Sequence, residues 1–268
     1  MKMDFNLQLA ARLAQASADA YHAASVNDPA TDTQVLVEEW PAGATCFAFR
    51  GTSDFRDALT DSKIIMAGAP DLPAHEGRLH LGVTRAVESV IGQLAKICRE
   101  SPPTQRFYFT GHSLGGGCAP LAAYMLALEG FNVAGVVTFA GMRFCDPVFK
   151  TNYNRLLGDR TFRVVAQYDV VPHLPLPGWL LPYRHTGTEI YLSSPHPAAR
   201  LEIPKIKISR RPAEVLLADC WTIFKAWRCL RTFTGALNPL TLPADIVQMH
   251  AIARYQRLIG NLNLNPLQ

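Results

Sequence analysis

The sequence of 268 residues lacks most of the features that would assign it to a specialised class of protein. Its six cysteines form no C-x-x-C pair and no cluster with histidine at zinc spacing, so no metal site is expected. Only 18% of the residues are charged and 49% are hydrophobic, which excludes a disordered chain. The longest unbroken apolar stretches, such as 121–128, are far shorter than the roughly 20 residues of a membrane-spanning helix. What remains is a chain that can bury a substantial core.

Positive charge is concentrated in one segment of the chain. Residues 201–235 carry seven Lys and Arg against three Asp and Glu, a net charge of +4. Because the whole chain also has a net charge of +4, the rest of it is neutral. Nucleic-acid binders normally present a broad basic face, so no nucleic-acid partner is expected.

The amino-terminal segment reads as a helix and not as a secretion signal. Asp4 and Gln8 interrupt any apolar run, while apolar residues between Phe5 and Tyr21 recur at helical spacing. Four of the six cysteines lie within apolar patterns and are expected to be buried thiols. A reducing, cytoplasmic location is therefore the default expectation.

Strand and helix patterns alternate along the chain, which indicates parallel βαβ units and an α/β fold. Segments 33–40 and 45–50 are expected to form a hairpin. Further strands are predicted at 105–110, 133–139, 161–166 and 185–192, and helices at 83–98, 114–128, 147–157, 213–233 and 244–259. No linker divides the chain, so residues 1–268 are predicted to form a single domain with a basic helical insertion around 196–243.

The strongest chemical signal is the run G-H-S-L-G at 111–115. It fits the pattern G-x-S-x-G and has the required context, an apolar strand before it and a small-residue helix after it. Glycines at both ends remove the clashes of a sharp turn, and the helix start directs free N–H groups at the reacting oxygen. The run lacks the lysine and the spacing of phosphate-binding loops, so Ser113 is the candidate nucleophile rather than a packing residue in a Gly-rich turn.

A serine nucleophile needs a base, and the base needs an orienting acid. In α/β sheets that carry a nucleophile on such a turn, these residues follow the serine in the order acid, then histidine. Asp169 lies just past the carboxyl end of the strand at 161–166, where open α/β sheets place functional groups. Asp146 precedes a proline and is expected to cap the next helix, and Asp159 lies before its strand, so Asp169 is the candidate acid.

Four histidines follow Asp169 in the chain: His173, His185, His196 and His250. The first is only four residues away and the second begins a strand. His196 lies between two prolines and is the alternative candidate for the base. His250 lies in the last helical pattern, late enough for the chain to have returned to the active edge of the sheet.

The strand at 45–50 is followed by a glycine and a small hydroxyl residue, Gly51 and Thr52. An oxyanion hole needs one N–H from the residue after the nucleophile and one from the loop after an early strand. The Leu114 N–H and the Thr52 N–H are the candidates, with an ordinary strand-ending turn as the alternative for Thr52.

At several places together the chain resembles the class 3 lipases, the fungal-type lipase family of the α/β-hydrolases. The matching stretches are 49–52 with Asp57 and Asp61, His80-Leu81-Gly82-Val83, the elbow at 111–116, the acid loop 169–175, the strand from His185 to Tyr191, and His250 with Tyr255. The resemblance covers roughly 33–195 and 244–259.

The resemblance implies an α/β-hydrolase fold, with a mostly parallel sheet and helices on both faces. It implies hydrolysis of acylglycerol or related lipid esters with no metal or cofactor. Ser113 would be the nucleophile, Asp169 the orienting acid and His250 the base, with Thr52 and Leu114 as oxyanion donors. An acyltransferase with the same triad and a non-catalytic lipid- or membrane-binding protein are the alternative functions.

The gap of 81 residues between Asp169 and His250 is longer than this resemblance leads us to expect, and it contains the basic segment. Residues 213–233 carry an apolar helical stripe with cations beside it. A helical cap over the core is the favoured interpretation, and a helix that docks residues 205–233 on anionic membrane is the alternative. Residues 64–78 are a candidate loop lid.

Overall fold

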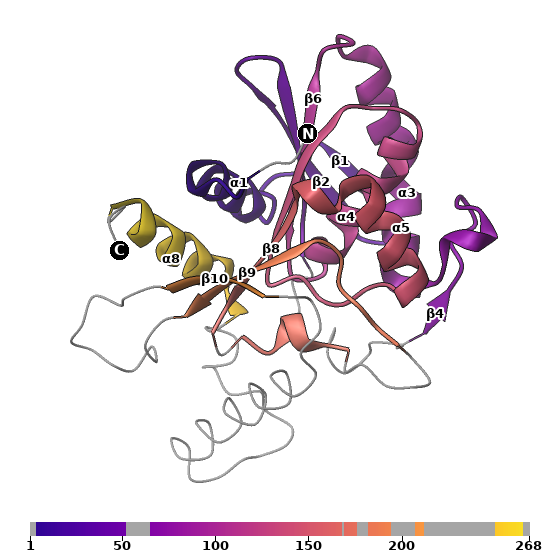
Figure 1. Ribbon diagram of the computed structural model, residues 1–268. Coiled ribbons are helices and arrows are strands. Elements are labelled where there is room, and N and C mark those ends of the chain that lie inside the picture. Colours follow the sequence, from indigo (N-terminus) through magenta and orange to yellow (C-terminus); the bar gives the residue numbers. More distant parts are fainter. Residues whose placement is uncertain are drawn as a thin grey trace.

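The computed structural model describes residues 4–51, 65–167, 169–175, 182–193, 207–211 and 250–264 (Figure 1). Thr52, His196 and the helix predicted at 213–233 lie outside the described residues. Within the described part no helix is long and apolar enough to cross a bilayer.

A central sheet of eight strands organises the molecule. In spatial order the strands are β1 (Val26–Asp28), β2 (Thr33–Trp40), β3 (Ala44–Phe49), β6 (Arg106–His112), β7 (Val133–Phe139), β8 (Thr161–Ala166), β9 (Thr188–Ser193) and β10 (Lys207–Arg211). The five strands from β3 to β9 are parallel, and β1, β2 and β10 are antiparallel at the two edges. The expected hairpin is confirmed as β2 and β3, and the mostly parallel sheet is confirmed as well.

Helices cover both faces of this sheet (Figure 1). On one side lie α3 (Leu81–Glu100), α4 (Gly115–Leu128) and α5 (Pro147–Leu157), and on the other α1 (Leu7–Asp19) packs against α8 (Ile252–Leu264). A separate small sheet pairs β4 (Met66–Ala67) with β5 (Leu79–His80). Short 3-10 turns lie at Ala74–Glu76 (η1), Gly158–Arg160 (η2) and Val171–His173 (η3).

Two hydrophobic cores lie on opposite faces of the sheet, because successive side chains of a strand point to opposite faces. On β3, Phe47 and Phe49 pack in the core with α3 and α4, whereas Cys46 and Ala48 pack in the core with α1 and α8. All six residues of β3 are buried, as expected of a strand covered on both faces. The four cysteines of the described part, at 46, 98, 118 and 145, are buried free thiols.

Three predicted elements differ from the observed ones. The last predicted helix is interrupted at Ala251: His250 is itself helical, and α8 begins at Ile252. The strand predicted from 185 begins at Thr188 because Gly187 adopts a left-handed conformation (φ 66°) that interrupts an extended chain. Residues 207–211 of the insertion expected to be helical form a strand, β10, which pairs antiparallel with β9. The candidate loop lid contains β4 and η1.

The tight approach of α4 to the sheet gives a stability prediction. A Cβ on Gly115 would collide with the carbonyl oxygen of Phe49, whereas a Cβ on Gly92 in α3 would meet nothing within 4 Å. Gly115→Ala should therefore lower the free energy of unfolding by about 2–4 kcal/mol. Gly92→Ala, the matched control, should raise it by about 0.5–1 kcal/mol because alanine is the better helix former. Urea unfolding measures both, and equal effects would contradict this account of the elbow.

Candidate active site

The candidate nucleophile lies on a strained turn between β6 and α4. Ser113 has φ 59°, a conformation that residues with a side chain rarely adopt, and its N–H donates to the Phe139 carbonyl at 3.1 Å. A Cβ on Gly111 would collide with the Gly115 carbonyl on the far side of the turn. The two glycines of the motif are therefore required by backbone contacts on both sides of the serine.

One expected oxyanion donor stands at the start of α4. Leu114 is the N-cap residue of this helix, where backbone N–H groups have no intrahelical acceptor. The other donor, Thr52, lies outside the described residues. Gly51 before it packs against the elbow, since a Cβ on Gly51 would lie 2.7 Å from the His112 carbonyl oxygen and 3.2 Å from the Ser113 Cβ. The loop after β3 thus begins beside the elbow.

The structure brings together Asp169 and His250, which are 81 residues apart in the chain. The His250 Nδ1 atom lies 3.1 Å from Asp169 Oδ2 and 3.2 Å from Oδ1, and the two side chains are buried. Asp169 follows the carboxyl end of β8, and His250 precedes α8. This is the contact that an orienting acid makes with a histidine base.

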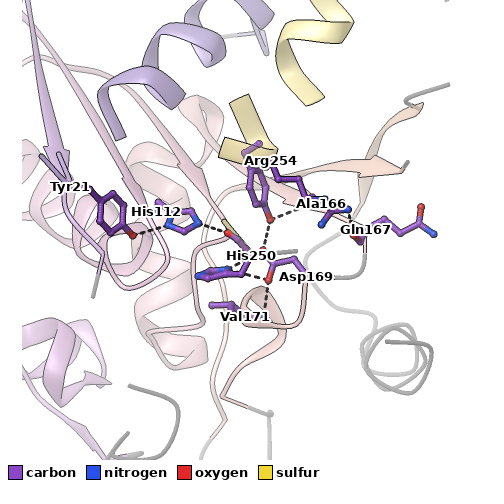
Figure 2. Close-up of polar contacts among 9 residues, drawn as sticks. Tyr21, His112, Ala166, Gln167, Asp169, Val171, His250 and Arg254 are labelled. Atoms are coloured by element: carbon purple, nitrogen blue, oxygen red, sulfur yellow. Dashed lines mark hydrogen bonds and ion pairs between the residues drawn. The ribbon is translucent and has the colours of Figure 1, made fainter. Parts of the chain in front are cut away.

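Three donors compensate the burial of the Asp169 carboxylate. The Tyr255 hydroxyl donates to Oδ2 at 2.7 Å and the Val171 N–H donates to Oδ1 at 3.0 Å, in addition to the histidine contact (Figure 2). Burial alone would raise the pKa of Asp169, but the charge and hydrogen bond of His250 and the two other donors together lower it below the usual value. The carboxylate is therefore ionised and can stabilise an imidazolium.

Helix α8 is fastened to the end of β8 by side chains of its first turn. The Tyr255 hydroxyl accepts the Ala166 N–H at 3.1 Å, and the Arg254 guanidinium donates to the Gln167 carbonyl at 2.6 Å (Figure 2). The resemblance singled out Tyr255 from the sequence, whereas nothing local marked Arg254. These contacts hold the chain around His250 against the strand that supplies Asp169.

The residue before the nucleophile touches His250 directly, a contact that sequence reasoning missed. The centroids of the His112 and His250 rings are 4.5 Å apart, and the His112 Nε2 atom lies 2.7 Å from the His250 carbonyl oxygen. Because Ser113 follows His112, the serine-bearing turn and the candidate base are brought together at this contact. His112 also forms a hydrogen bond with Tyr21, 91 residues away in the chain. No local sequence pattern could have predicted these contacts of His112.

The rival residues have other partners. Asp146 caps α5 by accepting the Phe149 N–H at 2.9 Å, as expected. Asp159 bonds to the neighbouring Arg160 at 3.0 Å. The His185 Nε2 atom lies 2.6 Å from the Pro172 carbonyl oxygen. Across the described residues, no three His, Cys, Asp or Glu side chains are grouped as metal ligands.

Comparison with known proteins defines the class of this fold and site. The sequence profile of the family described as Lipase (class 3) matches residues 46–179, half of the chain. The chain belongs to the class 3 lipases.

Two of the matched relatives are fungal lipases. The chain is 32% identical over 154 residues to a lipase of Rhizopus niveus, covering 54% of this chain and 38% of that one. It is 30% identical over 170 residues to the secreted mono- and diacylglycerol lipase 1 of Fusarium solani, covering 62% and 49%. The chain thus spans less than half the length of these curated relatives.

Solved structures support the fold. A Rhizomucor miehei lipase–propeptide complex superposes with a TM-score of 0.65 at 20% identity, covering 78% of this chain and 72% of that one. Lipase II from Rhizopus niveus gives a TM-score of 0.64 at 22% identity, covering 78% and 86%. The α/β-hydrolase fold predicted from the sequence is confirmed.

Buried histidines near the sheet should make the protein sensitive to acid. Burial, and then the cations Arg163 and Arg143, lower the pKa of His185 well below its ordinary value, and burial also lowers that of His80. Between these depressed values and about pH 6.5 the unfolded chain binds more protons, so the free energy of unfolding falls as the pH falls. Each such histidine contributes up to about 1.4 kcal/mol per pH unit to this slope.

Urea unfolding between pH 7 and pH 5 measures this slope. His185→Gln should reduce it by up to about one proton, whereas His22→Gln, at an exposed position, serves as the matched control and should leave it unchanged. A stability that is flat over this range in the wild-type protein would contradict the assignment of these histidines as neutral.

Proposed function

We propose that the protein is a serine ester hydrolase that cleaves acylglycerols or related lipid esters through an acyl-enzyme intermediate. The observation that carries this proposal is the buried Asp169–His250 pair, packed against the residue that precedes Ser113. A carboxylate held by three donors beside an imidazole, next to a serine on a strained turn, has the chemical form of a charge-stabilised base with its nucleophile.

In the proposed reaction the Ser113 oxygen attacks the ester carbonyl carbon while the His250 imidazole takes the hydroxyl proton. The carbonyl π electrons move to the oxygen, and the N–H groups of Leu114 and Thr52 stabilise this oxyanion. Collapse expels the alcohol, which receives the proton from His250 and leaves an acyl ester on Ser113. Water then repeats the sequence and releases the carboxylic acid. Asp169 keeps Nδ1 of His250 protonated and stabilises the imidazolium.

The lipid character of the substrate rests on family membership and on the relatives, which include a lipase and a secreted mono- and diacylglycerol lipase. An acyltransferase would use the same residues, with an alcohol in place of water in the second half of the reaction. A protein that only binds lipid would have no use for the buried acid–histidine pair. Acylglycerol hydrolysis therefore accounts for the largest share of the observations.

A series of p-nitrophenyl esters of increasing acyl length tests the proposed function. The wild-type protein should hydrolyse them with rates that depend on acyl length. Ser113→Ala should lower kcat by about 10³-fold or more with its fold intact, because the covalent route is lost. Added glycerol or a long-chain alcohol should not divert most of the acyl group from water. Predominant transfer to the alcohol would assign an acyltransferase, and binding to liposomes without turnover would assign a lipid-binding protein.

We further propose that residues 205–233 contact anionic membrane surfaces. This segment carries a net charge as large as that of the whole chain, and its cations are Lys205, Lys207, Arg210, Arg211, Lys225, Arg228 and Arg231. Each cation near an anionic surface contributes about 1 kcal/mol to binding. The net positive charge of the chain thus coincides with the apolar helical stripe of residues 213–233.

Charge neutralisation tests the membrane contact. Arg228→Gln with Arg231→Gln should weaken binding to phosphatidylserine vesicles by about 30-fold and leave hydrolysis of a soluble short-chain ester unchanged. The matched control neutralises Lys96 and Arg99, two exposed cations of α3, and should have little effect on vesicle binding. Equal effects of the two pairs would contradict a specific contact surface.

A further inference from the structure

Hydrogen bonds connect the segment that follows the amino-terminal helix to the backbone of His250. Ser17 and Thr110 share a hydrogen bond of 2.8 Å between buried hydroxyls, which fixes α1 against β6. Tyr21, just beyond the end of α1, lies with its hydroxyl 2.9 Å from His112 Nδ1, and His112 Nε2 lies 2.7 Å from the His250 carbonyl oxygen (Figure 2).

The direction of each bond in this chain follows from its last acceptor. A carbonyl oxygen only accepts, so His112 must carry its hydrogen on Nε2 and donate to His250. Burial, reinforced by the charge of His250, lowers the pKa of His112 to about 3, so the ring is neutral and its Nδ1 is an acceptor. The Tyr21 hydroxyl therefore donates to Nδ1. Burial raises the pKa of Tyr21 to about 12, and the Gly51 N–H donates to the same oxygen.

The two histidine rings also face each other. Their centroids are 4.5 Å apart and their planes are inclined by 31°, and both side chains are buried. A neutral ring at this distance places no second positive charge beside the His250 ring. When His250 takes the serine proton in the proposed reaction, the resulting imidazolium therefore lies against the neutral His112 ring. A second protonated ring at this position would repel it.

His112 directly precedes Ser113 in the chain, at the end of β6. The turn at Ser113 is strained, and His112 is the last residue of β6. Two successive residues therefore have linked roles: Ser113 is the nucleophile, and the His112 side chain contacts the backbone and the ring of His250. His250 precedes α8, and the His112 side chain contacts its carbonyl oxygen.

We propose that Tyr21 and His112 are positioning residues that hold His250 in register with Ser113. Tyr21 fixes the tautomer of His112, and His112 fixes the main chain and one ring face of His250. This inference rests on the proposed function and deepens it, because it assigns the segment that follows the amino-terminal helix a part in catalysis. Because Gly51 also donates to Tyr21, the same hydroxyl ties the loop that leads to Thr52 to the elbow.

The test compares three variants on a soluble short-chain ester. His112→Leu removes the donor and the ring, and it should lower kcat by about 10–100-fold with KM within about twofold, since misplacement of a catalytic group has effects of this size. His112→Gln retains an amide N–H that can reach the His250 carbonyl, and it should recover at least about tenfold of that loss. Tyr21→Phe removes a single oxygen atom and should lower kcat by about threefold to tenfold.

Tyr153→Phe is the matched control, since its hydroxyl makes a buried hydrogen bond of 2.8 Å to Thr161 that does not involve His250. It should leave kcat unchanged at a comparable loss of stability in urea. Wild-type kcat in Tyr21→Phe and His112→Leu, or a loss in Tyr153→Phe equal to that in Tyr21→Phe, would overturn the positioning role while wild-type turnover keeps the proposed function intact. No turnover by the wild-type protein would overturn both. Tyr21→Phe decides the question if His112→Leu does not fold.

Discussion

The candidate site depends on one buried contact, the pairing of the Asp169 carboxylate with the His250 imidazole. An isolated carboxylate would be far too costly at a fully buried position, so its three donors are a condition for its being charged there. Tyr255 supplies one of them and also receives the Ala166 N–H, which fixes α8 to β8. The hydrogen bonds that compensate the burial of the Asp169 carboxylate therefore also position His250.

The second constraint is steric. The serine-bearing turn fits only because two glycines allow the backbones of β3, β6 and α4 to approach within contact distance. This close approach brings the start of the loop after β3, the start of α4 and the ring of His112 to one edge of the sheet. Strain at Ser113 is thus maintained by the packed strands and by α4, every residue of which from Gly115 to Leu126 is buried.

The sequence predicted those parts of the fold that have local causes. Alternating strand and helix patterns gave the parallel sheet, and the glycine spacing around Ser113 gave the elbow. Asp169 followed from its place after a strand. The contacts of Tyr21 with His112 and of Arg254 with Gln167 join residues about 90 positions apart, and no local pattern encodes them. β10 was missed because residues 196–243 were interpreted together as a helical insertion. The alternation of cations and apolar residues that begins at Lys205 has the period of a strand and was the available signal.

The most direct test of the central claim is the rate of covalent labelling by a fluorophosphonate, with the modified residue mapped by mass spectrometry. The account predicts a single adduct on Ser113 and a rate that falls by about 10³–10⁴-fold in Asp169→Asn, since the amide can no longer hold the imidazole in the reactive tautomer. An adduct on another residue, or labelling of Ser113 at the wild-type rate in Asp169→Asn, would contradict it.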